Sequence, residues 1–427
     1  MTTASRPPGT AETVVVGGGA IGASTAYALA AEGHQVVLLE RGAVGRGASA
    51  GTACLLTPSH SERMASPAAL REGLRSLPDP TGPFSLRPTP RLLPWLARFT
   101  LAALQGASVV EEGTVLLRRM AQQSLALHQA WHDRLDTGLV RRGLLNAYLT
   151  APGLVARDAL VAAHRALGMA AEVLDADGVR DLEPAVRGAR GGAFHPDEAH
   201  LDSLVFVQRV VAGARRAGAV VCEDVEVLRV TRDHGQLTIT TTAGSIRAER
   251  LVLATGVAVG RFARDLGVRL PVQPAKGYHV EHRVEPPPLT RPVFLAETRV
   301  VATPLTGRLR LAGTLELGTD PEAVDHRRVA AVAAAGRRHV AGLDTAPVTG
   351  LWRGSRPMSA DGLPIVGRTS GDDRVLVAVG HGMLGITLAP HTAVALVRLA
   401  RGEPHDPALR ALRPERFARR RRPRAAG

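Results

Sequence analysis

The chain contains few cysteines and no long apolar run. Cys54 and Cys222 are the only cysteines among its 427 residues, which excludes a disulfide framework, and no Cys/His spacing indicates zinc or another bound metal. The first twelve residues contain no apolar core, and glycines interrupt the apolar stretch that follows. A signal peptide and a membrane span are therefore not predicted. These features favour a cytoplasmic protein in a reducing compartment.

Aromatic residues make up only 3% of the chain, and this scarcity argues against a protein that stacks on nucleic-acid bases. The formal net charge is nevertheless +14, and seven arginines lie between Arg413 and Arg424. Because only Phe417 is aromatic there, we interpret residues 418–427 as a solvated basic tail rather than a nucleic-acid patch. Peripheral contact with an anionic membrane is compatible with the same charge.

Lysine is almost absent. Lys276 is the single lysine, so 52 of the 53 lysine and arginine residues are arginine. A lysine that persists against this composition indicates a need for a compact ammonium group, whose pKa responds to its surroundings more readily than that of a guanidinium. Retention of this lysine by chance is the alternative that the sequence leaves open.

Residues 14–40 predict a β-α-β unit, in which an apolar strand, a helical segment and a second strand follow one another. Gly17, Gly19 and Gly22 form the pattern G-x-G-x-x-G between the first strand and the helix. Such glycines allow a tight turn, close approach of a pyrophosphate and close helix packing. Glu40 ends the second strand, where a carboxylate accepts hydrogen bonds from ribose hydroxyls. The unit predicts a dinucleotide site and leaves NAD and FAD open.

A second glycine-rich stretch follows this unit. Gly47, Ser49 and Gly51 match the G-x-S-x-G pattern of the hydrolase nucleophile elbow. An elbow requires a strand directly before the serine and a helix after it. A glycine-rich loop precedes Ser49 instead, so we reject a hydrolase.

Nine segments in a fixed order carry a more specific resemblance. They are GGGAIG, LLER, GASAGTACLLTP, VLATG, PAKGYHVE, RLRLAGTLE, RPMSADGLPIVG, GHGMLGITLAP and LRPERF. Together they resemble the D-amino-acid oxidase and dehydrogenase superfamily of FAD enzymes, which includes glycine and sarcosine oxidases. The bacterial D-amino-acid dehydrogenase branch is the closest match.

This resemblance implies an α/β fold in which a Rossmann-like FAD-binding domain is assembled from discontinuous segments, beside a substrate domain with a mixed or antiparallel sheet. The residues expected in the FAD-binding domain are 13–60, 155–265 and 350–417. The substrate and cap domain is expected over residues 61–154 and 266–349. Residues 1–12 are expected to form a disordered tail.

Cofactor contacts are carried over from the resemblance by position. The residues expected at the FAD phosphates and glycine turn are Gly17, Gly19, Ala20, Ile21, Gly22, Ala48 and Ser49. Those expected at the adenosine are Glu40, Arg41 and Val225. Those expected near the isoalloxazine ring are Ala53, Cys54, Leu55, Gly380, Gly382, Met383, Leu384 and Gly385, with Gly256 closing the VLATG segment.

Cys54 departs from the family pattern, which has glycine at this position. A free cysteine usually behaves as a small buried apolar residue, and this is the reading that we adopt for Cys54. A perturbation of the flavin and a covalent attachment of the flavin are the two alternatives.

Arg356, in the segment WRGSRPMSADGLPIVG, is the strongest candidate for a substrate-binding residue. In the relatives an arginine of this loop faces the flavin and holds the substrate carboxylate. A planar guanidinium with two parallel donors suits a carboxylate. An ion pair of Arg356 with Asp361 is the structural alternative, and Arg353 is the competing substrate ligand.

Four further residues are candidates for the active site. His381 lies in the GHGMLG loop, where it is either catalytic or a structural loop residue. Tyr278 and His279 are expected to line the substrate pocket, with a purely structural place at a strand edge as the alternative. Lys276 is expected near the flavin or the substrate entrance.

The expected reaction is oxidation of a carbon–nitrogen bond in a small amine or amino acid, namely a D-amino acid, an imino acid or an N-substituted glycine. FAD is the expected cofactor, and oxygen or an electron carrier is the expected final acceptor. An NAD-dependent dehydrogenase is the first alternative. A flavoprotein that acts on tRNA is the second, because it would explain the basic tail. The oligomeric state and the exact substrate are left open.

Overall fold

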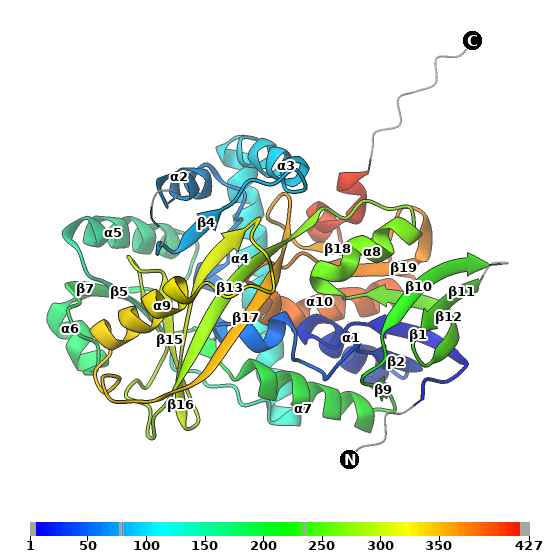
Figure 1. Cartoon of the computed structure of the whole chain (residues 1–427), viewed down its shortest axis with the longest axis horizontal. Coiled ribbons are helices and arrows are strands. Elements are labelled where there is room, and N and C mark those ends of the chain that lie inside the picture. Colours follow the sequence, from blue (N-terminus) through cyan, green and yellow to red (C-terminus); the bar gives the residue numbers. More distant parts are fainter. Residues whose placement is uncertain (1–5, 77–78, 80, 234–235, 419–427) are drawn as a thin grey trace, which may run out of the picture.

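Figure 1 shows the computed structural model of the chain, which describes residues 6–76, 79, 81–233 and 236–418. Two large sheets lie in the two halves of the molecule. Between them stand β13 (Val272–Arg283) and β17 (Val348–Ser359), which belong to the second sheet and contact the short helix η1 (Ala48–Gly51) of the other half. Residues at this border can therefore meet groups from both halves.

The first sheet has a parallel centre in the order β9-β2-β1-β12-β19. Its strands are β1 (Thr10–Val16), β2 (Val36–Leu39), β9 (Val220–Cys222), β10 (Val227–Asp233), β11 (Gln236–Thr241), β12 (Gly244–Leu253), β18 (Ile365–Thr369) and β19 (Asp372–Val379). Val15 packs into the core on one face, whereas Val14 and Val16 pack into the core on the other. This alternation, with period two, buries both faces of β1.

Helices cover the two faces of the first sheet. The core on one face includes residues of α1 (Ala20–Ala31), α4 (Ala107–Leu135), α7 (Ser203–Arg216) and α10 (Gly385–Ala400). The core on the other face includes residues of α8 (Val259–Asp265) and α3 (Leu93–Ala103). A sheet buried on both faces by helices is the arrangement of nucleotide-binding α/β domains.

The second sheet runs in the order β17-β13-β16-β15-β14-β5-β7-β6, and β4 pairs with β16. Its further strands are β4 (Phe84–Leu86), β5 (Leu144–Tyr148), β6 (Glu172–Asp175), β7 (Gly191–His195), β14 (Val293–Leu295), β15 (Val300–Leu305) and β16 (Arg308–Leu317). Helix α9 (His326–His339) packs its Val332 against one face, beside Val280 and Leu311. We call this the outer face.

The opposite face of the second sheet, which we call the inner face, meets the loop that contains η1. The Thr303 hydroxyl donates to the Ala53 carbonyl oxygen at 2.7 Å, and Arg310 Nη1 donates to the Ala50 carbonyl oxygen at 3.1 Å. Along β13 the residues alternate between the faces, so His279 lies on the inner face while Val280 lies on the outer face. We call the half of the molecule that contains the first sheet the nucleotide-binding half. The inner face of the second sheet is the one that looks toward it.

The remaining elements are short or peripheral. They are α2 (Pro67–Ser76), α5 (Ala151–Ala166), α6 (Ala176–Leu182), the pair β3 (Leu55–Leu56) with β8 (Ala199–His200), η2 (Pro58–His60), η3 (Gly256–Ala258), η4 (Pro407–Leu412) and η5 (Pro414–Phe417). No helix within the described ranges is long and apolar enough to cross a bilayer.

The predicted β-α-β unit is confirmed by β1, α1 and β2, and the α/β class is confirmed by the two sheets. The two sheets depart from the expected domain division at several segments: α3 and α4, expected in the cap, pack on the first sheet, and β17, expected from residue 350 in the FAD-binding domain, belongs to the second sheet. Residues 155–265 were assigned to the FAD-binding domain, yet β6 and β7 pair in the second sheet, where β7 is the neighbour of β5. Short strands carry no sequence signal for their pairing partner, because pairing is decided by tertiary contacts.

Candidate active site

The predicted glycine turn lies directly at the start of α1. Gly17 has a φ of +106°, and a Cβ on Gly22 would lie 1.8 Å from the Gly17 carbonyl oxygen, so neither position accepts a larger side chain. Helix α1 begins after Gly19 without a side-chain cap, and the Ala20 N–H donates to Ser49 Oγ at 2.8 Å. Open N–H groups at a helix start attract an anion, so this cradle fits the pyrophosphate of a dinucleotide.

Glu40 lies beside the glycine turn. Its carboxylate accepts hydrogen bonds from the Gly18 N–H at 2.6 Å and the Gly42 N–H at 3.2 Å. The Val225 N–H donates to the Glu40 carbonyl oxygen at 2.9 Å, so two residues that were far apart in the sequence and expected at the adenosine are neighbours. Arg41 is exposed next to them. The set fits a ribose and an adenine.

The loop over residues 48–55 packs against the inner face at a tryptophan. A Cβ on Gly51 would lie 2.0 Å from the ring of Trp352, and a Cβ on Gly354 would lie 2.1 Å from the same ring. The ring also stacks on His279, with centroids 5.6 Å apart and an interplanar angle of 14°. Glycine is therefore required at both positions, and the tryptophan fixes the separation between loop and strand.

Cys54, in the same loop, has a φ of +63° and is fully buried. Glycine adopts this left-handed conformation without strain, which gives a physical reason for glycine at this position in the family pattern. The thiol contacts Arg310, whose Nη1 lies 3.0 Å from Sγ and also donates to the Thr52 carbonyl oxygen at 3.0 Å. The packed state of Cys54 agrees with the reading adopted from the sequence.

Arg356 lies on the inner face of β17. Its Nη1 donates to the Thr314 carbonyl oxygen at 3.0 Å, and the guanidinium crosses β13 over Gly277, where a Cβ would lie only 2.1 Å from Nη1. Burial lowers the pKa of Arg356 to about 10, so the side chain keeps its positive charge at neutral pH. Within the described ranges it forms no ion pair with an acidic residue.

Asp361, the alternative partner of Arg356, and Arg353, the competing substrate ligand, both pair with other residues. Asp361 pairs with Arg416, whose Nε lies 2.7 Å from Asp361 Oδ2. Arg353 pairs with Glu322 and donates to the Pro321 carbonyl oxygen at 3.3 Å. Residues three apart on a strand point to opposite faces, so Arg353 lies on the outer face. Arg356 is the one of the two that looks toward the nucleotide-binding half.

Tyr278 and Lys276 also lie on the outer face, and this corrects the expectation that Tyr278 and His279 line one pocket. The Tyr278 hydroxyl accepts from the Asp325 N–H at 3.0 Å, and burial raises its pKa to about 12. Lys276 Nζ lies 3.4 Å from Glu316 Oε2. Adjacent residues of a strand face opposite ways, so only His279 shares the inner face with Arg356.

The GHGMLG loop is joined to β17 beside Arg356. The Gly382 N–H donates to the Pro357 carbonyl oxygen at 2.9 Å, and Gly380 and Gly382 both have positive φ. Burial lowers the pKa of His381 to about 3, and its Nε2 lies 3.1 Å from Thr392 Oγ1 on α10. The imidazole is therefore neutral at physiological pH and anchored to the helix that the loop precedes.

The remaining expected cofactor residues frame the same region. Gly385 starts α10, whose first turn has no side-chain cap, and Met383 and Leu384 precede it. The Leu55 carbonyl oxygen accepts from the Thr387 hydroxyl at 3.2 Å, which joins the 48–55 loop to α10. Gly256, at the start of η3, has a φ of +55°. N–H groups at the start of α10 suit negative charge, as on a reduced flavin.

Three residues that shape the inner face escaped the sequence analysis. Trp352 was present in the quoted WRGSRPMS segment, but its packing between two glycines is visible only after the strands pair. Thr314 supplies the carbonyl that binds Arg356, and Arg310 ties the 48–55 loop to the sheet. Alternation along RLRLAGTLE predicts that Arg310 lies on the opposite face from its two leucine neighbours. It does not predict whether that face is the inner or the outer one.

No group of three or more His, Cys, Asp or Glu side chains that could hold a metal ion occurs in the part of the chain that the structure describes. The arrangement instead combines a phosphate cradle, an adenosine edge and an arginine without an acidic partner. Such a set can hold a dinucleotide and orient a small carboxylate beside it.

Comparisons with known proteins agree with this geometry. The family model for FAD dependent oxidoreductases, DAO, matches residues 12–399. The D-amino acid dehydrogenase of Methylobacterium sp. strain 4-46 is 33% identical, over 97% of this chain and 99% of the relative. The glycine oxidase of Bacillus licheniformis is 28% identical, over 92% and 94%.

A solved structure supports the same assignment. The crystal structure of glycine oxidase from Geobacillus kaustophilus is similar with a TM-score of 0.77 and 25% identity, and the match covers 95% of this chain and 98% of that one. L-proline dehydrogenase from P. horikoshii, at 16% identity and a TM-score of 0.76, shares the fold over 96% of this chain and 98% of that one. The chain belongs to the DAO family of FAD-dependent oxidoreductases.

Proposed function

We propose that this FAD-dependent oxidoreductase oxidises the carbon–nitrogen bond of a small α-amino acid, with D-amino acids as the first class to test and imino acids and N-substituted glycines as the next. The observation that carries the proposal is Arg356. It is a partly buried cation that has no acidic partner among the described residues, on the face that looks toward the nucleotide-binding half. A buried charge without a partner is costly, so a carboxylate ligand is its expected complement.

Arg356 would bind the substrate carboxylate with its free guanidinium donors, because Nη1 is already turned toward the Thr314 carbonyl oxygen. This bond fixes the guanidinium plane and hence the direction from which the carboxylate is held. Trp352 and Gly51 pack against each other and close the space between loop and sheet. When bound, FAD supplies the acceptor for the hydride that leaves the α-carbon.

Proton transfer in this mechanism would involve the substrate amine rather than a histidine of the protein. Burial lowers the pKa of His279 and of His381 to about 3 in each case, so each is a neutral imidazole and too weak a base to take a proton from a substrate ammonium at neutral pH. Orientation by Arg356 therefore supplies much of the catalysis, provided that the amine reaches the site uncharged.

The alternatives differ in their support. An NAD-dependent dehydrogenase is displaced by the FAD family match over residues 12–399. A role in tRNA modification would rest on the basic tail, of which residues 419–427 lie outside the described residues, and no other feature favours it. The free, buried thiols of Cys54 and Cys222 support the proposed reducing compartment.

Anaerobic mixing of the holoenzyme with a panel of D-amino acids, imino acids and N-methyl glycines tests the proposal, with flavin absorbance as the readout. We expect at least one member of the panel to bleach the flavin. Bleaching by amines that lack a carboxylate, together with none by the amino acids, would contradict the role of Arg356. Reoxidation with oxygen, compared with a quinone analogue, then identifies the class of the acceptor.

A further inference from the structure

The single lysine of the chain is held at three points on the outer face. Lys276 Nζ donates to the carbonyl oxygens of Asp320 and Ala323, each at 2.8 Å, and lies 3.4 Å from Glu316 Oε2. The side chains of Lys276 and Glu316 are both almost completely buried. Three acceptors thus converge on one ammonium, which matches its three donors and leaves none for a ligand.

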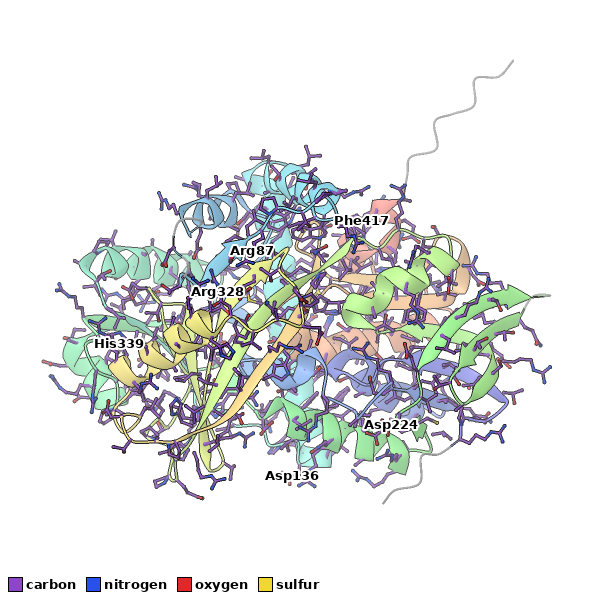
Figure 2. All side chains as sticks on the ribbon, in the orientation of Figure 1. Arg87, Asp136, Asp224, Arg328, His339 and Phe417 are labelled. Carbon is purple, nitrogen blue, oxygen red and sulfur yellow. The ribbon has the colours of Figure 1, made fainter. Side chains whose placement is uncertain are left out.

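A hollow of about 380 Å³ lies on this outer side, lined by residues that include Arg87, Lys276 and Asp325. Arg87 and Arg328 are labelled on this part of the molecule in Figure 2. Arg328 Nε lies 3.8 Å from Glu316 Oε1. The acids and bases around the hollow largely pair with each other, so its polar groups hold the segment in place and do not form the substrate site.

Strand β16 carries a bulge beside this lysine. Lys276 pairs with Glu316 and Tyr278 pairs with Gly313, so two residues of β16 face only Gly277 on β13. One of the two, Thr314, has a φ of +63°. A bulge redirects a strand locally and re-aims its groups, and the redirected group here is the Thr314 carbonyl, which accepts the hydrogen bond from Arg356.

The position of this bulge depends on what holds the strands on either side of it. On the side of Tyr278, the hydroxyl is tied to the Asp325 N–H. On the other side, Lys276 binds its cross-strand partner Glu316 and two carbonyls of the segment that follows β16. Without the ammonium, the buried Glu316 would lose a close cation, and the register at which pairing resumes would be less strongly specified.

We propose that Lys276 is a positioning residue for carboxylate recognition: from the outer face it fixes the β16 bulge that presents the Thr314 carbonyl to Arg356 on the inner face. The inference rests on the proposed function, because it assigns Lys276 a task only if Arg356 binds the substrate carboxylate. It also accounts for lysine rather than arginine, since a planar fork cannot direct its donors to three acceptors around one point.

The test uses propionate, a carboxylate without an amine, and follows the flavin absorption band of the holoenzyme during titration, so that no turnover is needed. Lys276→Met, Arg356→Ala and the combined variant form a double-mutant cycle. If Lys276→Met alone fails to fold, the double variant Lys276→Met/Glu316→Gln takes its place in the test, because it leaves no unpaired buried carboxylate. Arg353→Ala is the matched control, since it removes another outer-face cation that binds the segment after β16.

We expect Lys276→Met, or the double variant Lys276→Met/Glu316→Gln in its place, to raise the Kd for propionate about tenfold. With the amino-acid substrate, KM should rise by a similar factor while kcat changes within about twofold. Lys276→Arg should restore only part of the affinity, and Arg353→Ala should leave it unchanged. In the Arg356→Ala background, the effect of Lys276→Met should disappear.

Two results would overturn the inference alone. One is an unchanged Kd in the Lys276 variants while Arg356→Ala abolishes binding, and the other is an equal loss in both backgrounds, which would mark a general structural role. A Kd that is unchanged in Arg356→Ala would instead contradict the proposed function itself. The two failures are therefore distinguishable.

Discussion

The basic residues on the two faces of the β13–β17 pair differ in whether they are paired with an acidic side chain. On the outer face, Lys276 is paired with Glu316 and Arg353 with Glu322. On the inner face, Arg356 binds a carbonyl oxygen and, in the part of the chain that the structure describes, no acid. Strand alternation brings these states within a few residues of one another. The paired cations hold the structure together, whereas Arg356 is available to a ligand, as the proposed function requires.

The largest expected effect comes from removal of the unpaired cation. Arg356→Ala should cost about 3 to 5 kcal/mol in transition-state binding, as for a lost buried charge partner, with FAD content unchanged. Steady-state kcat/KM and the flavin absorbance of the purified variant measure the two quantities. Arg353→Ala is the control from the other face and should retain near-normal turnover. The reverse outcome would move the carboxylate site to Arg353.

The second prediction displaces Arg356 without removing it. In Gly277→Ala the new Cβ would lie 2.1 Å from Arg356 Nη1, so the guanidinium must leave the Thr314 carbonyl. A displacement of about 1 Å at a binding group can cost roughly 100-fold in rate, and we expect a loss in kcat/KM of this order. Gly260→Ala, where nothing lies within 4 Å of the added Cβ, serves as the control. Full activity in Gly277→Ala would show that the position of the guanidinium is unimportant.

The third prediction concerns pH. Burial lowers the pKa of Arg356 to about 10, so the cation is present below that pH and is lost as the pH rises through it. Propionate affinity should therefore be constant near neutral pH and weaken about tenfold per unit well above pH 10. Titrations of the holoenzyme with propionate at a series of pH values measure this affinity. In the complex, the bound carboxylate raises the pKa of the guanidinium above its value in the free protein. A transition near pH 6.5 would implicate a histidine instead.

The smallest expected effect lies on the loop that faces the inner face. Cys54→Gly relieves a left-handed conformation, worth about 1 kcal/mol, and loses the contact of Sγ with Arg310 at 3.0 Å. The free energy of unfolding should therefore change by less than about 1 kcal/mol, with flavin content and activity retained. Denaturant titration measures it, and Cys222→Gly, at a buried strand position without positive φ, should be clearly less stable. Loss of the flavin in Cys54→Gly would favour the covalent alternative.

Local signals were sufficient for much of the cofactor region. The turn at Gly17, Gly19 and Gly22, the helix after it and the acid Glu40 lie within one β-α-β unit, so their spacing alone places them together. The cap of α7 was predictable in the same way, because the Asp202 carboxylate accepts from N–H groups only two and three residues away. Interactions over such short separations depend little on the rest of the chain.

Other features were decided by the tertiary structure. Alternation predicts that Arg353 and Arg356 point opposite ways, but which face meets the nucleotide-binding half depends on the packing of α9 against the other. The burial of Lys276 depends on carbonyls 44 and 47 residues away, and the bulge opposite Gly277 appears only when β13 and β16 pair. The sequence by itself determined the cofactor cradle and the residue types at the site, because those follow from local geometry. Only the tertiary structure decided which of Arg353 and Arg356 is paired with an acid, because pairing depends on distant segments that share no local pattern.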